Sequence, residues 1–173
     1  ANIPAMKTLT VISGEHPASI AGKFTFTLAA LSNPDNGAVL PTVLEVTNPD
    51  ADGGAITFGD ITFKKPGTYT FTITESVTLT EEEKLNNVTD KVVPGVSIDG
   101  EPKQVTIEVV DNKNGTMTAT VQTYTSQNPV TFTNQYSVGN AMIDIPVYKI
   151  LDEKGLHPAS IAGKFTFTLA ALS

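Results

Sequence analysis

The sequence predicts an all-β fold of the sandwich type, and three observations point to it. Short segments in which apolar and polar residues alternate recur along the whole chain, with the period of half-buried strands. Clusters of Gly, Pro, Asn and Asp separate these segments. Threonine is abundant, tryptophan is absent and long helix-forming runs are scarce. Many short strands with regularly spaced turns favour two packed sheets.

Each expected strand is a segment in which apolar and polar residues alternate. The first strand runs through Lys7, with Ala5, Leu9 and Val11 on the same face. The later strands are expected at residues 24–31, 55–63, 68–75, 105–110, 116–123 and 130–136. Turn residues between them gather at 33–37, 48–54, 64–67 and 111–115. Residues 81–87, which open with three glutamates, are interpreted as a loop or a short helical turn.

The composition argues against several classes of partner. The formal net charge is −7, and no Lys and Arg cluster could neutralise phosphates, so we expect no nucleic-acid partner. Without cysteine, neither a disulfide nor a thiolate metal site can stabilise the protein. No apolar run approaches the roughly 20 residues that span a bilayer. We therefore expect no membrane span in this chain, and any targeting segment to lie outside it.

An internal repeat divides the chain. Residues 16–32 recur identically as 157–173, and IPAMKTL at 3–9 is similar to IPVYKIL at 145–151. A truncated repeat cannot bury its own apolar face, so the second copy is expected to be mobile or docked on another surface. The predicted organisation is a complete domain at 1–136, a linker at 137–140 and the truncated start of a second, homologous repeat at 141–173.

Three polar residues fall on strand faces that are otherwise apolar. By strand phase, Lys7 lies with Leu9, Glu75 lies with Phe71 and Ile73, and Asn134 lies with Val130 and Phe132. Burying a lone ammonium or carboxylate is costly, so three such residues in one core require mutual compensation or a covalent outcome. We predict that the three side chains lie close together.

Four runs, in this order, resemble the isopeptide-forming domains of Gram-positive major pilins of the streptococcal T-antigen type. They are MKTLT at 6–10, GKFTFTL at 22–28, FGDITFKKPGTYTFTITE at 58–75 and VTFTNQY at 130–136. The resemblance covers residues 3–136. It implies an inverted immunoglobulin-like, pilin-type β-sandwich that contains an intramolecular isopeptide bond.

The resemblance also implies a role for each buried polar residue. Lys7 would bond to Asn134, and Glu75 would assist as the proton shuttle. Desolvation lowers the pKa of a buried Lys and raises that of a buried Glu, so a neutral amine could attack the Asn134 amide while Glu75 moves protons and ammonia leaves. Lys149 is the equivalent lysine of the second repeat and is expected to be unreacted, because its Glu and Asn partners are missing from the chain.

Two other patterns in the sequence are similar to metal or catalytic sites. Asn48, Asp50, Asp52 and Gly53 match the opening of a calcium loop, but Gly59 stands where a bidentate Glu is needed, which favours a solvated turn. His16 and His157 occupy equivalent repeat positions and have no second His or Cys to pair with in the sequence. We expect no metal, no cofactor and no enzyme that turns over external substrates.

The expected function is a shaft or stalk module of a bacterial cell-surface pilus or adhesin. The expected location is extracellular and cell-wall anchored, with the anchor signal outside this chain. Its partners would be neighbouring repeats, and residues 145–173 could replace the matching strands of a second molecule in a strand-swapped assembly. The alternative is an adhesin module that binds host glycan or matrix protein through its long loops at 33–54 and 76–104. Tandem repeats and the lack of an aromatic-lined loop favour the stalk.

Overall fold

The computed structural model describes residues 1–49, 53–152, 154–155 and 160–171. Contacts between residues divide the chain into two compact units, Ala1–Gly139 and Asn140–Ser173. Each unit is described by itself. Within the described residues, no helix is long and apolar enough to cross a membrane.

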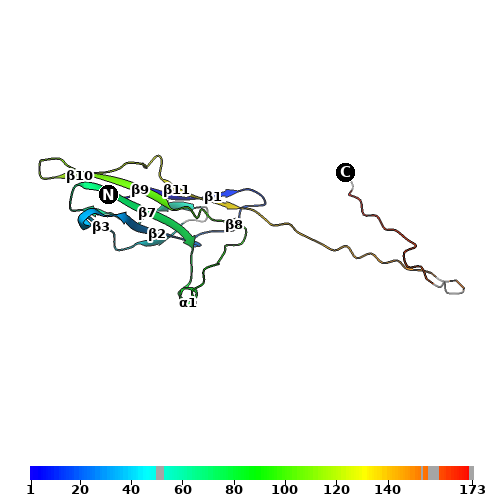
Figure 1. Ribbon diagram of the computed structural model, residues 1–173. Helices are drawn as coiled ribbons and strands as arrows, with labels where there is room; N and C mark the ends of the chain where they lie inside the picture. Colours follow the sequence, from blue (N-terminus) through cyan, green and yellow to red (C-terminus); the bar gives the residue numbers. More distant parts are fainter. Residues whose placement is uncertain (50–52, 153, 156–159, 172–173) are drawn as a thin grey trace. The chain divides into compact units, whose positions relative to one another are not determined.

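The first unit is a β-sandwich with two principal sheets (Figure 1). The four-stranded sheet has the order β5-β1-β11-β8, and the five-stranded sheet has the order β10-β9-β7-β2-β4. A separate pair, β3-β6, completes the set. The strands are β1 (Ala5–Val11), β2 (Phe24–Ser32), β3 (Ala38–Val39), β4 (Glu45–Thr47), β5 (Gly53–Ile56), β6 (Thr62–Phe63), β7 (Gly67–Val77), β8 (Val96–Ser97), β9 (Lys103–Asp111), β10 (Met117–Val121) and β11 (Val130–Tyr136).

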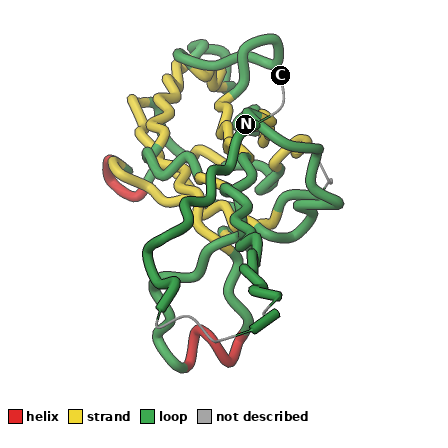
Figure 2. Tube along the Cα trace, turned by 90° about the vertical axis from the view of Figure 1, so that its right-hand side faces the viewer, coloured by secondary structure: helices red, strands yellow, loops and turns green. Residues whose placement is uncertain are grey.

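Among the described residues, helical structure is limited to two short segments. They are drawn in red in Figure 2. One is a single 3-10 turn, η1 (Pro34–Asn36), and the other is α1 (Glu81–Leu85). Thr80 caps α1 in a capping box, because its side chain accepts from Glu83 N–H while the Glu83 carboxylate accepts from Thr80 N–H. The segment 81–87 thus contains a short helical turn over Glu81–Leu85, one of the two structures expected for it.

The core lies between the two principal sheets. Alternate residues of β2, β7, β9 and β11 point inward and are almost completely buried, as the period of a strand requires. Phe26 of β2 and Phe132 of β11 belong to opposite sheets, and their ring centroids lie 5.3 Å apart. This ring contact joins the two layers through the middle of the sandwich.

The first and last strands of the unit are neighbours. β1 pairs with β11 in parallel, in a register that sets Lys7 beside Phe132 and Leu9 beside Asn134. The other strand pairs of the two principal sheets are antiparallel. Any contact between side chains of β1 and β11 therefore joins residues at the two extremes of the domain sequence.

The expected strand at 55–63 is wrong as a single element. β5 ends at Ile56 and β6 begins at Thr62, with an irregular segment between them. Gly59 has a φ of 104°, a left-handed conformation that interrupts a strand. Phe58 and Ile61 are nonetheless buried, so the apolar pattern reflects an irregular segment that packs into the core.

The second unit contains the repeated sequence but, in its described residues, not the strands. Its described residues contain no strand and no helix. Phe165 and Phe167 are 51% and 59% exposed, whereas Phe24 and Phe26, at the matching positions of β2, are completely buried. β2 pairs with β4 and β7, and nothing in the described part of 140–173 supplies such neighbours.

Candidate functional site

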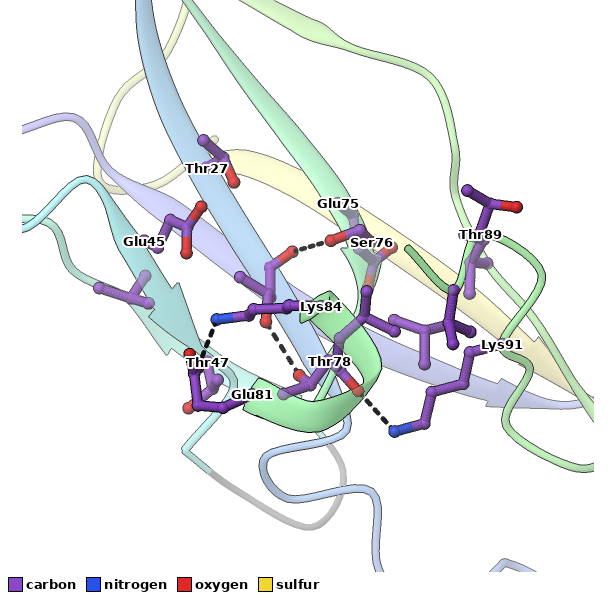
Figure 3. Close-up of a pocket in the computed structure, with 16 residues that line it drawn as sticks. Thr27, Glu45, Thr47, Glu75, Ser76, Thr78, Glu81, Lys84, Thr89 and Lys91 are labelled. Carbon is purple, nitrogen blue, oxygen red and sulfur yellow. Dashed lines mark hydrogen bonds and ion pairs between the residues drawn. The ribbon is translucent and has the colours of Figure 1, made fainter. Parts of the chain in front are cut away.

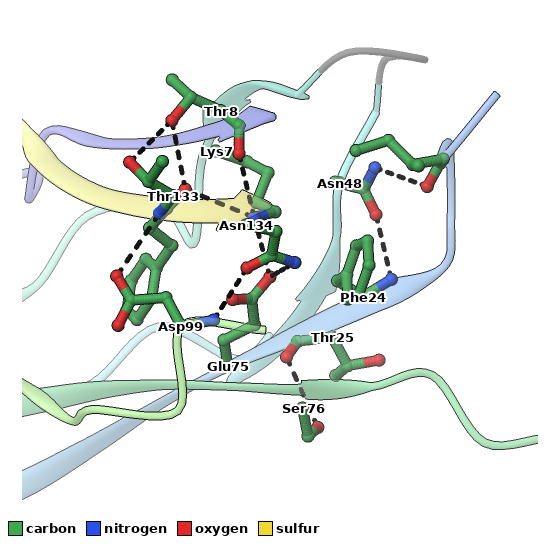
Figure 4. A network of polar contacts seen from close by, with 12 residues as sticks. Lys7, Thr8, Phe24, Thr25, Asn48, Glu75, Ser76, Asp99, Thr133 and Asn134 are labelled. Carbon is green, nitrogen blue, oxygen red and sulfur yellow. Dashed lines mark hydrogen bonds and ion pairs between the residues drawn. The ribbon is translucent and has the colours of Figure 1, made fainter. Parts of the chain in front are cut away.

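A cluster of polar side chains lies in the apolar core, and it consists of Lys7, Glu75 and Asn134 (Figure 4). Lys7 on β1 and Asn134 on β11 come from the four-stranded sheet, while Glu75 on β7 comes from the opposite sheet. The relative exposures are 1% for Lys7, 6% for Glu75 and 0% for Asn134. The structure thus brings together the three residues that strand phase placed on core faces.

One carboxylate oxygen connects the other two side chains. Glu75 Oε1 lies 3.2 Å from Lys7 Nζ and accepts a hydrogen bond of 3.1 Å from Asn134 Nδ2. Glu75 Oε2 is buried, and within the described residues no hydrogen-bond donor reaches it. An orphaned buried oxygen is costly for a charged carboxylate, so the site favours the protonated acid.

The amine of Lys7 is held by backbone and by an aromatic ring. Nζ donates to Thr8 O at 3.1 Å and to Phe132 O at 3.3 Å. It also lies 5.1 Å from the centroid of the Phe24 ring. These contacts fix the end of a flexible side chain in a place without bulk water, which is what a positioned nucleophile needs.

Burial changes the acid-base properties of both ionisable groups. Desolvation lowers the pKa of Lys7, and the neighbouring Glu75 charge opposes that change. Desolvation also raises the pKa of Glu75, against the opposing effects of Lys7, of the hydrogen bond from Asn134 and of the nearby Asp99 backbone. Both directions favour a neutral amine beside a neutral acid. A neutral amine can attack a carbonyl carbon, whereas an ammonium cannot.

The amide of Asn134 is oriented by donors and acceptors on its two ends. Oδ1 accepts from the backbone N–H of Asp99 at 2.8 Å, while Nδ2 faces Glu75. Exchanging O and N would set an NH₂ group against that N–H, so the hydrogen-bond network fixes the orientation. Sequence reasoning did not identify Asp99. No side-chain pattern could have signalled it, because the contact is made by the main chain.

The Asp99 side chain is held in place by an ion pair and by a hydrogen bond from the backbone. Its carboxylate accepts from Lys103 Nζ at 3.0 Å and from Thr133 N–H at 3.3 Å. Despite the cost of desolvation, these donors lower the pKa of Asp99. The segment that follows β8 is therefore attached to both β9 and β11 beside the polar cluster.

The remaining candidates do not join this cluster. Lys149, in the second unit, is exposed, and its Nζ donates to Ile150 O at 3.2 Å and lies 4.9 Å from the Phe165 ring centroid. His16 is exposed and contacts Pro17 O through Nδ1 at 2.8 Å, while His157 lies outside the described residues. Among the described residues, Lys149 has no Glu and Asn pair of the kind that surrounds Lys7.

The interpretation of Asn48 as part of a solvated turn is wrong. Asn48 is 1% exposed; its Oδ1 accepts from Phe24 N–H at 3.0 Å and its Nδ2 donates to Ile20 O at 2.8 Å. This side chain anchors the start of β2. Asp50 and Asp52 lie outside the described residues, and within those residues no group of acidic, His or Cys side chains could hold a metal ion.

A surface pocket of about 790 Å³ lies between the two long loops (Figure 3). Its lining comes from β2, from Glu45–Thr47 and from the segment between Glu75 and Ile98. Hydroxyl and charged side chains dominate, and several already bind one another: Lys84 pairs with Glu81 at 2.9 Å, and Lys91 donates to Thr78 O at 2.9 Å. No aromatic ring is among the described lining residues.

Comparison with known proteins gives one family and a set of structures. The family model described as FctA, a Spy0128-like isopeptide containing domain, matches residues 3–137. A crystal structure of the major pilin from Streptococcus pyogenes is 21% identical, with a TM-score of 0.48, over 79% of this chain and 50% of that one. The major pilin T-13 from the same organism is 17% identical, with a TM-score of 0.43, over 78% and 52%. This chain thus spans about half the length of those pilins, and a search of curated proteins found no match.

Proposed function

Because this chain belongs to the family of Spy0128-like isopeptide-containing domains, we propose that it is a structural shaft or stalk module that closes itself with a bond between Lys7 and Asn134. The observation that carries the proposal is the contact of Glu75 Oε1 with both the Lys7 amine and the Asn134 amide in a buried site. The carboxyl group is placed to take a proton from one nitrogen and give a proton to the other.

The reaction balances without a cofactor. Lys7 Nζ, as a neutral amine, adds to Asn134 Cγ, and the protonated Glu75 gives its proton to Asn134 Nδ2. Glu75 then takes one proton from Nζ, the bond between Cγ and Nδ2 breaks, and ammonia leaves. The product is an amide between Nζ and Cγ, and Glu75 ends in its starting state. Fixed geometry in the folded core supplies an advantage on the order of 7 to 11 kcal/mol in well-oriented systems.

The product explains why a stalk would use this chemistry. The bond closes a loop from residue 7 to residue 134. By analogy with disulfides, such a closure stabilises the folded domain by about 4 to 5 kcal/mol, because it lowers the entropy of the unfolded chain. Unlike a disulfide, an amide is not broken by reductants. The reaction occurs once in each molecule, so the domain catalyses its own cross-link and does not turn over external substrates.

The stalk belongs to a cell-surface pilus or a repeat-containing adhesin. In this proposal the protein is extracellular and attached to the cell wall, and its neighbours in the fibre are further copies of the same repeat. The organisation follows the repeat: a domain at 1–136, a linker at 137–140 and the start of a second domain at 141–173.

Intact mass under denaturing conditions tests the cross-link. We expect the parent chain to be lighter than its sequence mass by one ammonia, and the Lys7→Met and Asn134→Leu variants to keep the full mass. Glu75→Gln should also keep the full mass, since an amide cannot shuttle the proton. Lys149→Met is the matched control and should lose one ammonia like the parent. A parent chain at full mass after prolonged incubation rules out the cross-link.

Self-association through residues 145–173 is part of the proposal. Residues 157–173 repeat the sequence of 16–32, and the exposed Phe165 and Phe167 are the counterparts of core residues, so this segment could replace β1 and β2 of another molecule. We expect concentration-dependent dimers in light scattering, which a chain ending at residue 139 should not form. Monomers alone at high concentration argue against strand exchange.

The pocket between the two long loops favours a second candidate function, an adhesin module. It opens at the loops considered for ligand binding, and its hydroxyl and charged groups could hydrogen-bond a host glycan or matrix protein. A glycan and matrix-protein binding screen tests this candidate, with the Lys84→Ala and Lys91→Ala variants against the Lys113→Ala control. Saturable binding that only the pocket variants lose supports it.

A further inference from the structure

We propose that the backbone N–H of Asp99 stabilises the oxyanion that forms on Asn134 Oδ1 when Lys7 adds to the amide, and that the Asp99 carboxylate positions this donor. The inference rests on the proposed cross-linking reaction and assigns a part of it that Glu75 does not perform. Its starting point is the 2.8 Å hydrogen bond from Asp99 N–H to Asn134 Oδ1.

The orientation of the Asn134 amide divides the reaction between two groups. Glu75 faces Nδ2, the nitrogen that leaves as ammonia, and so it handles protons. The carbonyl oxygen faces Asp99 N–H. When the Lys7 nitrogen bonds to Cγ, the π electron pair of the C=O bond moves onto Oδ1, and it returns when the bond to Nδ2 breaks. A donor already aimed at that oxygen binds the charged state more strongly than the neutral amide.

The donor is fixed in place by contacts on three sides. β8 pairs with β11 through Ser97 and Gln135, just before the residue that carries the N–H. The Asp99 carboxylate binds Lys103 Nζ on β9 and Thr133 N–H on β11, the residue next to Asn134. An Asp99 N–H held this way needs no reorganisation when the charge develops, which is the condition for oxyanion stabilisation in a buried site.

The burial of the oxygen makes this donor important. Asn134 is completely buried, and Phe132 and Phe24 line the surrounding core, so water does not solvate the developing charge. Lys7 Nζ is the attacking group and Glu75 faces the nitrogen, which leaves the Asp99 N–H as the hydrogen-bond donor to Oδ1 among the described residues. Loss of a single oxyanion donor lowers rates by about 100- to 1,000-fold in enzymes.

The rate test follows bond formation in newly made protein. The chain is synthesised in a short cell-free pulse and quenched in denaturant at set times, and the fraction that has lost ammonia is read by intact mass. Asp99→Pro lacks the N–H and should react about 100-fold more slowly than the parent. Asp99→Ala keeps the N–H but loses its anchors and should be slowed, and Asp99→Asn, which keeps an acceptor for Thr133 N–H, should recover part of that loss. Glu101→Ala, on the same segment, is the control and should react at the parental rate.

A second measurement tests the contact itself and does not depend on the folding of Asp99→Pro. In a Lys7→Met chain, which cannot react, the Asp99 amide should exchange slowly with solvent deuterium. Adding Asn134→Leu removes the acceptor at similar volume, and we expect faster exchange at Asp99 while the Ser97 amide, as reference, is unchanged.

The outcomes separate this inference from the proposed function. If the parent never loses ammonia, the cross-link itself is absent. If the parent reacts and folded Asp99→Pro reacts at the same rate, the oxyanion role is overturned. Equal exchange at Asp99 with and without the Asn134 acceptor overturns it as well. Slow reaction of Asp99→Pro, partial rescue by Asp99→Asn and faster exchange without the acceptor support it.

Discussion

Lys7, Glu75 and Asn134 make physical sense only as a group. A single ammonium or carboxylate in this core would be strongly destabilising, because the apolar surroundings replace none of its hydration. Each of the three side chains supplies a partner for another, and the neutral forms of Lys7 and Glu75 further reduce the cost. Removing one of the three side chains should therefore lower the stability of the fold, because the remaining ionisable group stays buried without its partner.

A Lys7→Met chain should show this cost as a dependence of stability on pH. Without Lys7, the main opposing influence on Glu75 is gone and burial still raises its pKa above the unfolded value of 4.5. A raised folded pKa means that the stability is fully present below 4.5 and is lost as pH rises through the folded pKa. Urea midpoints measured across this range should fall with rising pH.

The matched control for that series is the Lys7→Met, Glu75→Gln double variant. Glutamine has the same shape and does not titrate, so its urea midpoint should lack the decrease attributed to Glu75. Parallel curves for the single and double variants would show that Glu75 is not the titrating group.

At the scale of strands, the alternation of apolar and polar residues predicted the strands well where it is regular along the whole segment. The predicted strands at 24–31, 68–75, 105–110 and 130–136 correspond to β2, β7, β9 and β11, with ends shifted by a few residues. The same period placed Lys7, Glu75 and Asn134 on core faces, which is why the cluster could be anticipated. The packing of the two sheets then determines which of these side chains touch, which alternation alone does not reveal.

Other elements carry no signal that a single sequence could reveal. β3, β4 and β8 are two or three residues long, too short for a period to show. The apolar residues at 56–61 enter the core from an irregular segment, and Asn48 looked like a turn residue although it hydrogen-bonds the main chain at the start of β2. Asp99 N–H is a main-chain group, so residue type gives no information about its contact.

The short strand β8 depends on Gly95, and replacing this glycine should loosen the strand. Gly95 has a φ of 75°, and a Cβ there would lie 2.7 Å from Tyr136 Cε2 and 2.9 Å from Ser137 O. We expect Gly95→Ala to cost about 2 kcal/mol in the free energy of unfolding, from backbone strain and overpacking. Denaturant unfolding in the non-reacting Lys7→Met background measures it.

Gly100→Ala is the control for this prediction. Gly100 lies on the other side of β8, within the same long connection from β7 to β9, and a Cβ there would meet nothing within 4 Å. Its substitution should change the free energy of unfolding by much less. A loss at Gly100 equal to that at Gly95 would attribute the effect to the connection in general and not to the contact with Tyr136.

At the scale of the whole molecule, the same repeated sequence has a different structure in each of the two units. The identical repeat is paired and buried in the first unit but exposed in the described part of the second. Adding a copy of residues 33–136 after Ser173 should supply the missing strands and give Lys149 its own Glu and Asn partners. We expect this extended chain to lose two ammonias in intact mass, and its Lys149→Met variant to lose one.

Pulling the first unit by its ends tests the mechanical role. Because β1 and β11 run parallel and adjacent, a cross-link between them carries the load before the intervening strands are stretched. In force spectroscopy the parent should show no lengthening between residues 7 and 134. The Glu75→Gln chain, which is expected not to form the bond, should release on the order of 400 Å when it unfolds. A parental chain that lengthens equally argues against a load-bearing bond.

β11 is the last strand of its unit, yet it lies inside its sheet, between β1 and β8. Ribosomes make the amino-terminal strands first, so the inner edge of β1 stays unpaired while the rest of the domain is synthesised. A nascent chain that has not reached Asn134 contains the amine and the acid but no amide for them to act on. In the proposed reaction, permanent closure is therefore postponed until the final strand has arrived.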